Sequence, residues 1–201
     1  MSKTRAGPIS YRLNADDVLR SIEAEALMQG LPIIGPGRGA YLDELVTQYK
    51  PRRILEIGTL VGYSAIRMGR LLPRGGRMTC IDNDPKYVQI AKSNIAKAWL
   101  SDRIEVLTGD AVSVIPKLAG QFDLVFIDAE KRRYLDYLKV CERHLRSGSI
   151  VVADNVKVFA AEVADYLDYV RNSGLYISTY REERFKGNPA ATDAIETSIR
   201  K

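Results

Sequence analysis

Apolar runs and amphipathic stripes alternate along most of the chain. A stripe over residues 14–29, with Asn14 available as an N-cap, predicts a first helix. A second helix is predicted over residues 40–49. Between them, residues 30–39 form a predicted loop of glycine and proline that also contains leucine and isoleucine. A solvent-facing loop has no need of these apolar residues, so we expect them to line a pocket.

After these helices, five buried strands are predicted, at residues 53–57, 77–81, 104–107, 122–127 and 149–153. Helices are predicted between and after them, at residues 63–72, 85–98, 111–118, 132–145 and 160–172. This alternation is typical of a parallel sheet with helices on both faces.

Two further extended runs, 175–180 and 194–199, close the chain and flank a polar segment, 181–192. They predict a hairpin at one sheet edge, joined by a polar loop. The sequence therefore predicts one α/β domain over residues 1–201, with a mostly parallel sheet and one antiparallel strand. Residues 1–14 lack periodicity and are predicted to form an arm.

The composition is that of an ordinary soluble globular protein, with 46% hydrophobic and 27% charged residues among 201. Since no apolar run approaches the roughly 18 residues that span a bilayer, we expect a cytoplasmic protein without a membrane partner. Cys80 and Cys141 have apolar neighbours and read as reduced, packed thiols. The net charge of +5 is compatible with an acidic or phosphorylated substrate but does not require one.

A glycine turn after the first strand organises the chain. Glu56 lies near the end of that strand, Gly58 and Gly62 follow four residues apart, and Ser64 precedes a helix. Such a corner brings backbone N–H groups to a ligand, but the spacing is not the Gly-x-Gly-x-x-Gly of dehydrogenases. Because Glu56 would repel a pyrophosphate, the turn favours a zwitterionic or cationic ligand such as S-adenosylmethionine (SAM). The alternative is a tight turn whose glycines serve only packing.

Acidic residues follow four of the predicted strands, and the ends of parallel strands meet at one edge of a sheet. Asp82 has the spacing from the glycine turn that suits ribose hydroxyls, although it could merely cap the next helix. Asp110 can reach an adenine amino group. Asp128, Asp154 and Asn155 offer three hard oxygens that suit Mg²⁺ or Ca²⁺, whereas Asp154–Asn155 alone could be a turn or a cap.

Lys131 follows Asp128 by three residues. Beside a divalent ion and partly desolvated, a lysine can lose its proton and act as a general base. The alternative is a surface lysine in the basic run 131–133. His144, the only histidine of the chain, has no partner motif, and we expect a structural role for it.

Taken together, these motifs resemble the cation-dependent O-methyltransferases, the catechol and caffeoyl-CoA group within the class I SAM-dependent methyltransferases. The resemblance covers roughly residues 30–201 and is carried by residues 55–64, 80–85, 126–131 with Tyr134, 152–156 and 193–196. The first two motifs indicate a methyltransferase, and the later ones are specific to the cation-dependent group. The resemblance implies a Rossmann-like α/β fold, with a seven-stranded, mostly parallel sheet whose last strand is antiparallel.

The resemblance also implies roles for single residues. The methionine part of SAM would be held by Glu56 with Ser64 nearby, and the ribose by Asp82. The complete implied cofactor set is Ile34, Glu56, Gly58, Thr59, Gly62, Ser64, Asp82, Asn83, Asp110, Ala111 and Asp128. Asp128, Asp154 and Asn155 would hold Mg²⁺, or Ca²⁺ or Mn²⁺ in its place, and Lys131 would be the catalytic base.

The implied reaction is metal-dependent methyl transfer to a hydroxyl of a catechol-like or vicinal-diol small molecule, by an enzyme for which a homodimer is a family expectation. Ala129 and Glu130 depart from the family, since catechol methyltransferases carry bulky residues there. The glutamate that holds the second catechol oxygen aligns near Gly187, with Asn188 or Glu183 as substitutes.

Two other functions stay open. Some bacterial relatives methylate a hydroxylated tRNA uridine, and this chain has basic clusters at Lys50/Arg52/Arg53, Lys131/Arg132/Arg133 and Arg181/Arg184/Lys186. Interleaved acids, Glu182 and Glu183, weaken that interpretation. A SAM-binding module without catalysis would need a broken metal or base position, and none is broken.

Overall fold

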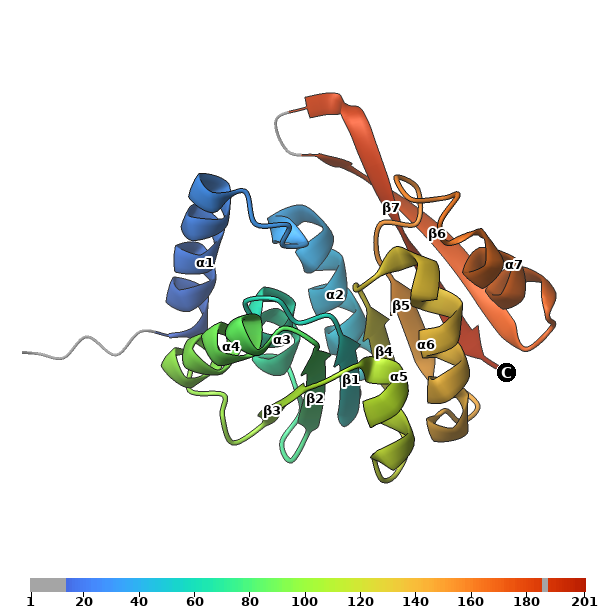
Figure 1. Cartoon of the computed structure of the whole chain (residues 1–201), viewed down its shortest axis with the longest axis horizontal. Helices are drawn as coiled ribbons and strands as arrows, with labels where there is room; N and C mark the ends of the chain where they lie inside the picture. The colour runs from blue at the N-terminus through green and yellow to red at the C-terminus, as the bar shows by residue number, and fades with distance from the viewer. Residues whose placement is uncertain (1–13, 186–187) are drawn as a thin grey trace, which may run out of the picture.

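The computed structural model describes residues 14–185 and 188–201, except for the side chains of residues 184–191 (Figure 1). Of the predicted arm, residues 1–13 therefore lie outside the described part. The described residues form one seven-stranded sheet in the order β3-β2-β1-β4-β5-β7-β6. The strands are β1 Arg53–Ile57, β2 Arg77–Asp82, β3 Ile104–Thr108, β4 Leu124–Ile127, β5 Ile150–Ala153, β6 Tyr176–Phe185 and β7 Asn188–Arg200.

Only β7 runs against the others, because it pairs antiparallel with both β5 and β6 while the remaining neighbours pair in parallel. The predicted Rossmann-like sheet with an antiparallel last strand is therefore confirmed. The helices are α1 Ala15–Gln29, α2 Gly35–Tyr49, α3 Tyr63–Gly69, α4 Pro85–Lys97, α5 Ala111–Val114, α6 Tyr134–Cys141 and α7 Ala164–Asn172. Short 3₁₀ turns occupy η1 Ile115–Lys117, η2 Lys131–Arg133 and η3 Glu142–His144.

Neighbouring side chains of a central strand enter two different apolar cores, as the pleat requires. Ile54 of β1 packs with α1 to α4 on one face of the sheet, and its neighbour Leu55 packs with α5 to α7 on the other (Figure 1). Both thiols are buried, and His144 is buried between the carbonyl oxygens of Gly120 and Ile115, at 2.8 and 3.1 Å from its ring nitrogens. The structural interpretations of these residues are confirmed. No helix in the described part of the chain is long and apolar enough to cross a bilayer.

The first helix begins where its cap predicts. Asn14 accepts a hydrogen bond from the Asp17 amide, and the Asp17 carboxylate accepts one from the Asn14 amide. The second helix begins at Gly35, five residues earlier than predicted. Pro36 suits the first turn of a helix, and Gly39 allows close packing, since a Cβ there would lie 2.8 Å from Cδ of Arg67 in α3.

The predicted polar loop 181–192 is wrong, because β6 and β7 continue through most of it. Its polar side chains have partners outside the hairpin. Arg181 pairs with Glu44 of α2 at 2.6 Å and lies over the Tyr41 ring. Glu182 pairs at 2.6 Å with Lys157, which follows β5. A ribbon whose charges are paired with neighbouring elements does not need apolar residues to stay extended.

Candidate functional site

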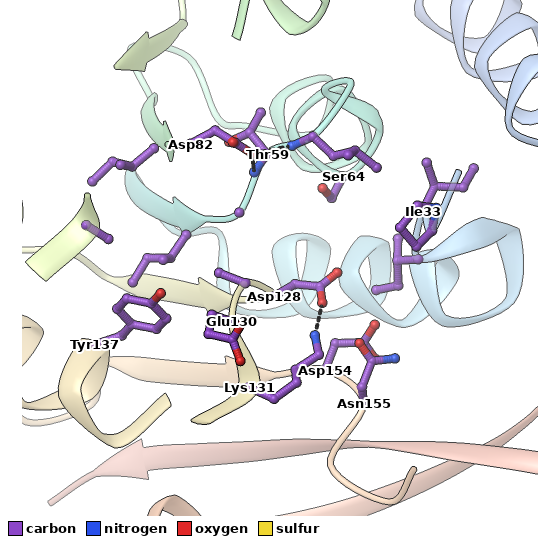
Figure 2. Close-up of a pocket in the computed structure, with 18 of the residues that line it drawn as sticks. Ile33, Thr59, Ser64, Asp82, Asp128, Glu130, Lys131, Tyr137, Asp154 and Asn155 are labelled. Carbon is purple, nitrogen blue, oxygen red and sulfur yellow. Dashed lines mark hydrogen bonds and ion pairs between the residues drawn. The ribbon is translucent and has the colours of Figure 1, made fainter. Parts of the chain in front are cut away.

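A cavity of about 700 Å³ lies at the carboxyl ends of the parallel strands, a volume that suits a small-molecule ligand (Figure 2). Among the predicted site residues that line it are Ile34, Gly58, Thr59, Ser64, Asp82, Asn83, Asp110, Ala111, Asp128, Lys131, Asp154 and Asn155. Glu56 and Gly62 do not line it. The expected apolar contribution of loop 30–39 comes from Pro32, Ile33 and Ile34.

The glycine turn has a structural reason for each glycine. Gly58 has φ +90°, and a Cβ there would lie 2.2 Å from the backbone oxygen of Asp128. Gly62 has φ +85° at the start of α3, and a Cβ there would approach Ala91 to 3.3 Å. Packing and backbone conformation therefore favour glycine at both positions, and residues 58–60 of the resulting turn line the cavity.

Asp82 ties this turn to β2. One of its oxygens accepts the backbone N–H groups of Thr59 at 3.0 Å and Leu60 at 2.8 Å. The other accepts the amide of Asp84 at 3.0 Å. Asp84, not Asp82, is the N-cap of α4. The cap interpretation of Asp82 is therefore wrong, and its carboxylate faces both the turn and the cavity.

Glu56 lies under the cavity floor and is fully buried. Its Oε2 accepts from the Thr59 hydroxyl at 3.1 Å, whereas its Oε1 has no hydrogen-bond partner among the described residues. Burial raises the pKa of Glu56 to about 7, and the nearby polar groups of Ser64, Cys80 and Thr59 oppose that rise. Of these partners, Thr59 and Ser64 line the cavity, so the carboxylate reaches it through their hydroxyl groups.

At one end of the cavity, Asp110 is already paired. Arg133 donates to its two oxygens at 2.8 and 3.4 Å, and Ser113 donates at 3.2 Å. The bond from Arg133 holds the pKa of Asp110 below its ordinary value. Arg133 also lies over the ring of Tyr137, 5.3 Å from its centroid. Tyr137 and Glu130 also line the cavity, and no sequence pattern marked Tyr137 (Figure 2).

Asp128 follows β4, and Asp154 and Asn155 follow the adjacent strand β5 (Figure 2). Asp154 is 1% exposed, and neither carboxylate oxygen has a hydrogen-bond partner among the described residues. Burial raises its pKa above the ordinary value, and the charge of Asp128 raises it further. Arg38 approaches one of its oxygens to 3.4 Å, within ion-pair distance but without a hydrogen bond.

A buried carboxylate without hydrogen bonds is costly unless a cation compensates it. In the described part of the chain, no cluster of three or more His, Cys, Asp or Glu is arranged to hold a metal ion. Beside the two carboxylates, the amide of Asn155, which follows Asp154 with a left-handed φ of +61°, offers a further oxygen. Two carboxylates and an amide form an all-oxygen set, and they fit Mg²⁺, Ca²⁺ or Mn²⁺.

Lys131 points into the cavity, so the surface interpretation of this side chain is wrong. Its ammonium group donates to Asp128 Oδ1 at 2.7 Å (Figure 2). It also donates to the Tyr134 hydroxyl at 2.9 Å. Tyr134 in turn donates to the backbone oxygen of Asp154 at 3.1 Å. The buried Tyr134 therefore links the lysine to the acidic pair.

The wall beside Lys131 comes in part from segment 155–160, which was expected to contribute to the pocket. Val158 and Phe159 line the cavity after Asn155, and Lys131 Nζ lies 5.7 Å from the centroid of the Phe159 ring. Asn188 and Glu183 were the proposed substitutes for the glutamate that holds the second catechol oxygen. Glu183 does not line the cavity, and it accepts a hydrogen bond from Arg181 at 2.7 Å. Gly187 and the Asn188 side chain lie outside the described residues.

The described members of the basic clusters do not face one surface. Lys131 and Arg133 bind the acids named above. Arg53 begins β1 at the opposite end of the sheet from the cavity, where it donates to the Ala119 carbonyl at 2.8 Å. Arg181 binds Glu44 and Glu183. The Arg184 side chain and Lys186 lie outside the described part of the structure.

The protein has recognisable relatives. A model of the O-methyltransferase family matches residues 15–178. A catechol O-methyltransferase of Niastella koreensis is 40% identical over 147 residues, which cover 70% of this chain and 66% of that protein. Catechol O-methyltransferase B of Danio rerio is 38% identical over 173 residues, 83% of this chain and 64% of that protein. The matches thus span just under two thirds of the length of these curated relatives.

The fold has counterparts as well. The crystal structure of an O-methyltransferase from Bacillus cereus in complex with S-adenosylhomocysteine (SAH) has a TM-score of 0.82 and 27% identity. The superposition covers 96% of this chain and 94% of that one. With a family model over most of the chain, relatives of this identity and a shared fold, the chain belongs to the O-methyltransferase family.

Proposed function

We propose that the protein is a SAM-dependent, divalent-cation-dependent O-methyltransferase that methylates a hydroxyl group of a catechol-like or vicinal-diol small molecule. The observation that carries the proposal is the buried Asp154 carboxylate, which lacks hydrogen bonds and lies beside Asp128, Asn155 and Lys131. This acidic group shares one cavity with the glycine turn and Asp82. The catechol O-methyltransferases named above, and the SAH complex of the Bacillus cereus relative, support the same assignment.

SAM, the methyl donor, would occupy the part of the cavity bordered by the glycine turn. A carboxylate offers about four lone-pair sites, and three backbone N–H groups donate to the carboxylate of Asp82. Asp82 can therefore still accept a hydrogen bond from a ribose hydroxyl. The adenine end would be bordered by Ala111, Glu130 and Tyr137. Glu56 would act on the methionine part through Thr59 and Ser64, because it does not reach the cavity itself.

A divalent cation would be held by Asp128, Asp154 and Asn155. Bound there, such a cation supplies a Lewis acid that lowers the pKa of a nearby hydroxyl group. The residues of the chain do the rest. Apolar side chains of Ile33 and Phe159, which line the cavity, would border the acceptor and keep water from it.

Lys131 would take the proton of the acceptor hydroxyl. The acceptor oxygen then forms a bond to the methyl carbon, the bond between that carbon and the sulfur of SAM breaks, and SAH leaves. Since the ammonium group of Lys131 donates to Asp128 and Tyr134, it must first release a proton to become a base. Fixed positions of donor, acceptor and base supply much of the rate acceleration.

The test measures methyl transfer from labelled SAM to a panel of catechols, with Mg²⁺ and with EDTA. Phenols with a single hydroxyl serve as matched acceptors, because they lack the second oxygen of the diol. We expect product from the vicinal diols only, and only with the metal. Product that is insensitive to EDTA would contradict the metal requirement.

If no small phenol is methylated, an acceptor of another chemical class has to be assayed. If the protein binds SAH but methylates no small phenol, the small-molecule proposal fails, and bulk hypomodified tRNA is the next acceptor to assay. Transfer to tRNA should weaken strongly with salt, because it would depend on phosphate contacts. If neither acceptor class is methylated although SAH binds, the protein is a SAM-binding module.

A further inference from the structure

Asp193, the sixth residue of β7, is 1% exposed and is the centre of a polar network beside the candidate metal ligands. Its Oδ1 accepts the backbone N–H groups of Val158 at 3.1 Å and Ala194 at 2.8 Å. Its Oδ2 accepts from Asn155 Nδ2 at 2.7 Å and from Arg38 Nη1. These donors match the roughly four lone-pair sites that a carboxylate offers.

The contact with Asn155 decides which way that amide faces. A carboxylate can only accept, so the group of Asn155 that faces Asp193 must be the NH₂ group. The amide oxygen is consequently turned away from Asp193 and is available to a cation. An asparagine at position 193 could donate as well as accept, and the Asn155 amide could then turn its NH₂ group toward the cation instead.

The guanidinium of Arg38 is a positive charge beside the candidate metal ligands. It is shared between Asp193 and Asp154, and the side chain of Arg38 is only 12% exposed, on the first turn of α2. Positive charge beside Asp154 compensates the buried carboxylate. The same charge also repels any divalent cation that binds Asp154, because like charges interact strongly where water is largely excluded.

We infer that Asp193 is a positioning residue of the metal site, which fixes the Asn155 amide as an oxygen ligand and anchors Arg38 as a cation that competes with the metal for Asp154. This inference rests on the metal-dependent function proposed above. It predicts effects of opposite sign at two contacting residues: loss of the Asp193 charge weakens metal binding, and loss of the Arg38 charge strengthens it. A merely structural role for the network would not produce opposite signs.

The experiment titrates Mn²⁺ into the full chain and follows free Mn²⁺ by electron paramagnetic resonance, without any activity measurement. Asp193→Asn should bind Mn²⁺ about 10- to 100-fold more weakly than the wild type, the usual effect of removing a partner that orients a metal ligand. Arg38→Met should bind it about tenfold more tightly. Glu196→Gln is the matched control, since Glu196 is an equally buried carboxylate of β7 that pairs with Arg171, and Mn²⁺ affinity should not change.

Folding is checked by thermal unfolding and SAH affinity, and only variants that unfold cooperatively and bind SAH are compared. If Asp193→Asn does not fold, Arg38→Met decides alone. Unchanged or weaker Mn²⁺ binding in Arg38→Met overturns the competition, and unchanged binding in folded Asp193→Asn overturns the positioning role, while the proposed function stands. A wild-type chain that binds no Mn²⁺ overturns the metal requirement itself, and this inference with it.

Discussion

The carboxylate of Asp82 accepts the backbone N–H of Leu60 at 2.8 Å, across the ends of β1 and β2. Leu60 has a left-handed φ of +47°, a conformation that costs a residue with a side chain on the order of 1 kcal/mol or more. Asp82 therefore compensates for backbone strain in the turn that borders the cavity. The residue expected to hold the ribose also holds the turn on which SAM would rest.

Replacement of Asp82 by Ala should consequently lower both stability and cofactor affinity. Hydrogen bonds to a charged group contribute about 1.5–3 kcal/mol each, so we expect SAH to bind at least about tenfold more weakly by calorimetry. Asp84→Ala is the control, because it removes the cap of α4 and should cost about 1 kcal/mol of stability while SAH affinity stays the same. Equal SAH affinity in both variants would exclude a cofactor role for Asp82.

Gly58→Ala should be among the most damaging small substitutions in the chain. The added Cβ would meet the backbone oxygen of Asp128 at 2.2 Å, at a φ of +90° that alanine avoids. We expect a loss of about 3 kcal/mol or more in the free energy of unfolding, measured by urea denaturation. Gly37→Ala in α2 has open space around its Cβ and should be neutral or stabilising by up to about 1 kcal/mol.

The sequence was sufficient to predict the cavity because parallel strands end at the same edge. That rule alone brings together Asp82, Asp110, Asp128 and Asp154, and the structure places all of them at one cavity. It could not reveal that Asp110 is paired with Arg133, or that Glu56 lies beneath the floor. Those outcomes depend on side-chain packing, which strand order does not specify.

Contacts between distant segments were also beyond reach. Arg38 of α2 and Asp193 of β7 are 155 residues apart in the sequence and meet only in the folded chain; the resemblance marks Asp193 but gives it no contact with Arg38. Helix α2 was predicted too short since its first turn, Gly35-Pro36-Gly37, has the composition of a loop. The hairpin of β6 and β7 was also predicted too short, because its charged residues have the composition of a solvent-exposed loop. In the folded chain these charges pair with residues that are far away in the sequence.

Glu56 should make the folded chain less stable as pH rises, whereas a carboxyl group whose pKa is lowered by folding makes it more stable. Burial raises its pKa from 4.5 to about 7, so the folded chain keeps this proton at pH values where the unfolded chain has lost it. The contribution to stability is therefore complete below pH 4.5 and is lost as pH rises through 7. We expect the wild type, without SAM, to lose about 3 kcal/mol relative to Glu56→Gln across this interval. Urea denaturation at several pH values measures the difference, and parallel curves for the two proteins would contradict a raised pKa.

Lys131 provides the sharpest test of the proposed chemistry. Lys131→Met keeps much of the apolar stem beside Phe159 but removes the amine, so we expect turnover to fall by about 10²–10⁴, the usual contribution of a general base. SAH affinity should change little, because the amine contacts Asp128 and Tyr134 rather than the glycine turn. Arg132→Met alters an exposed neighbour in the same basic run and should leave turnover unchanged. If Lys131→Met instead loses SAH binding, or if both variants retain full turnover, Lys131 is not the base and the proton must leave by another route.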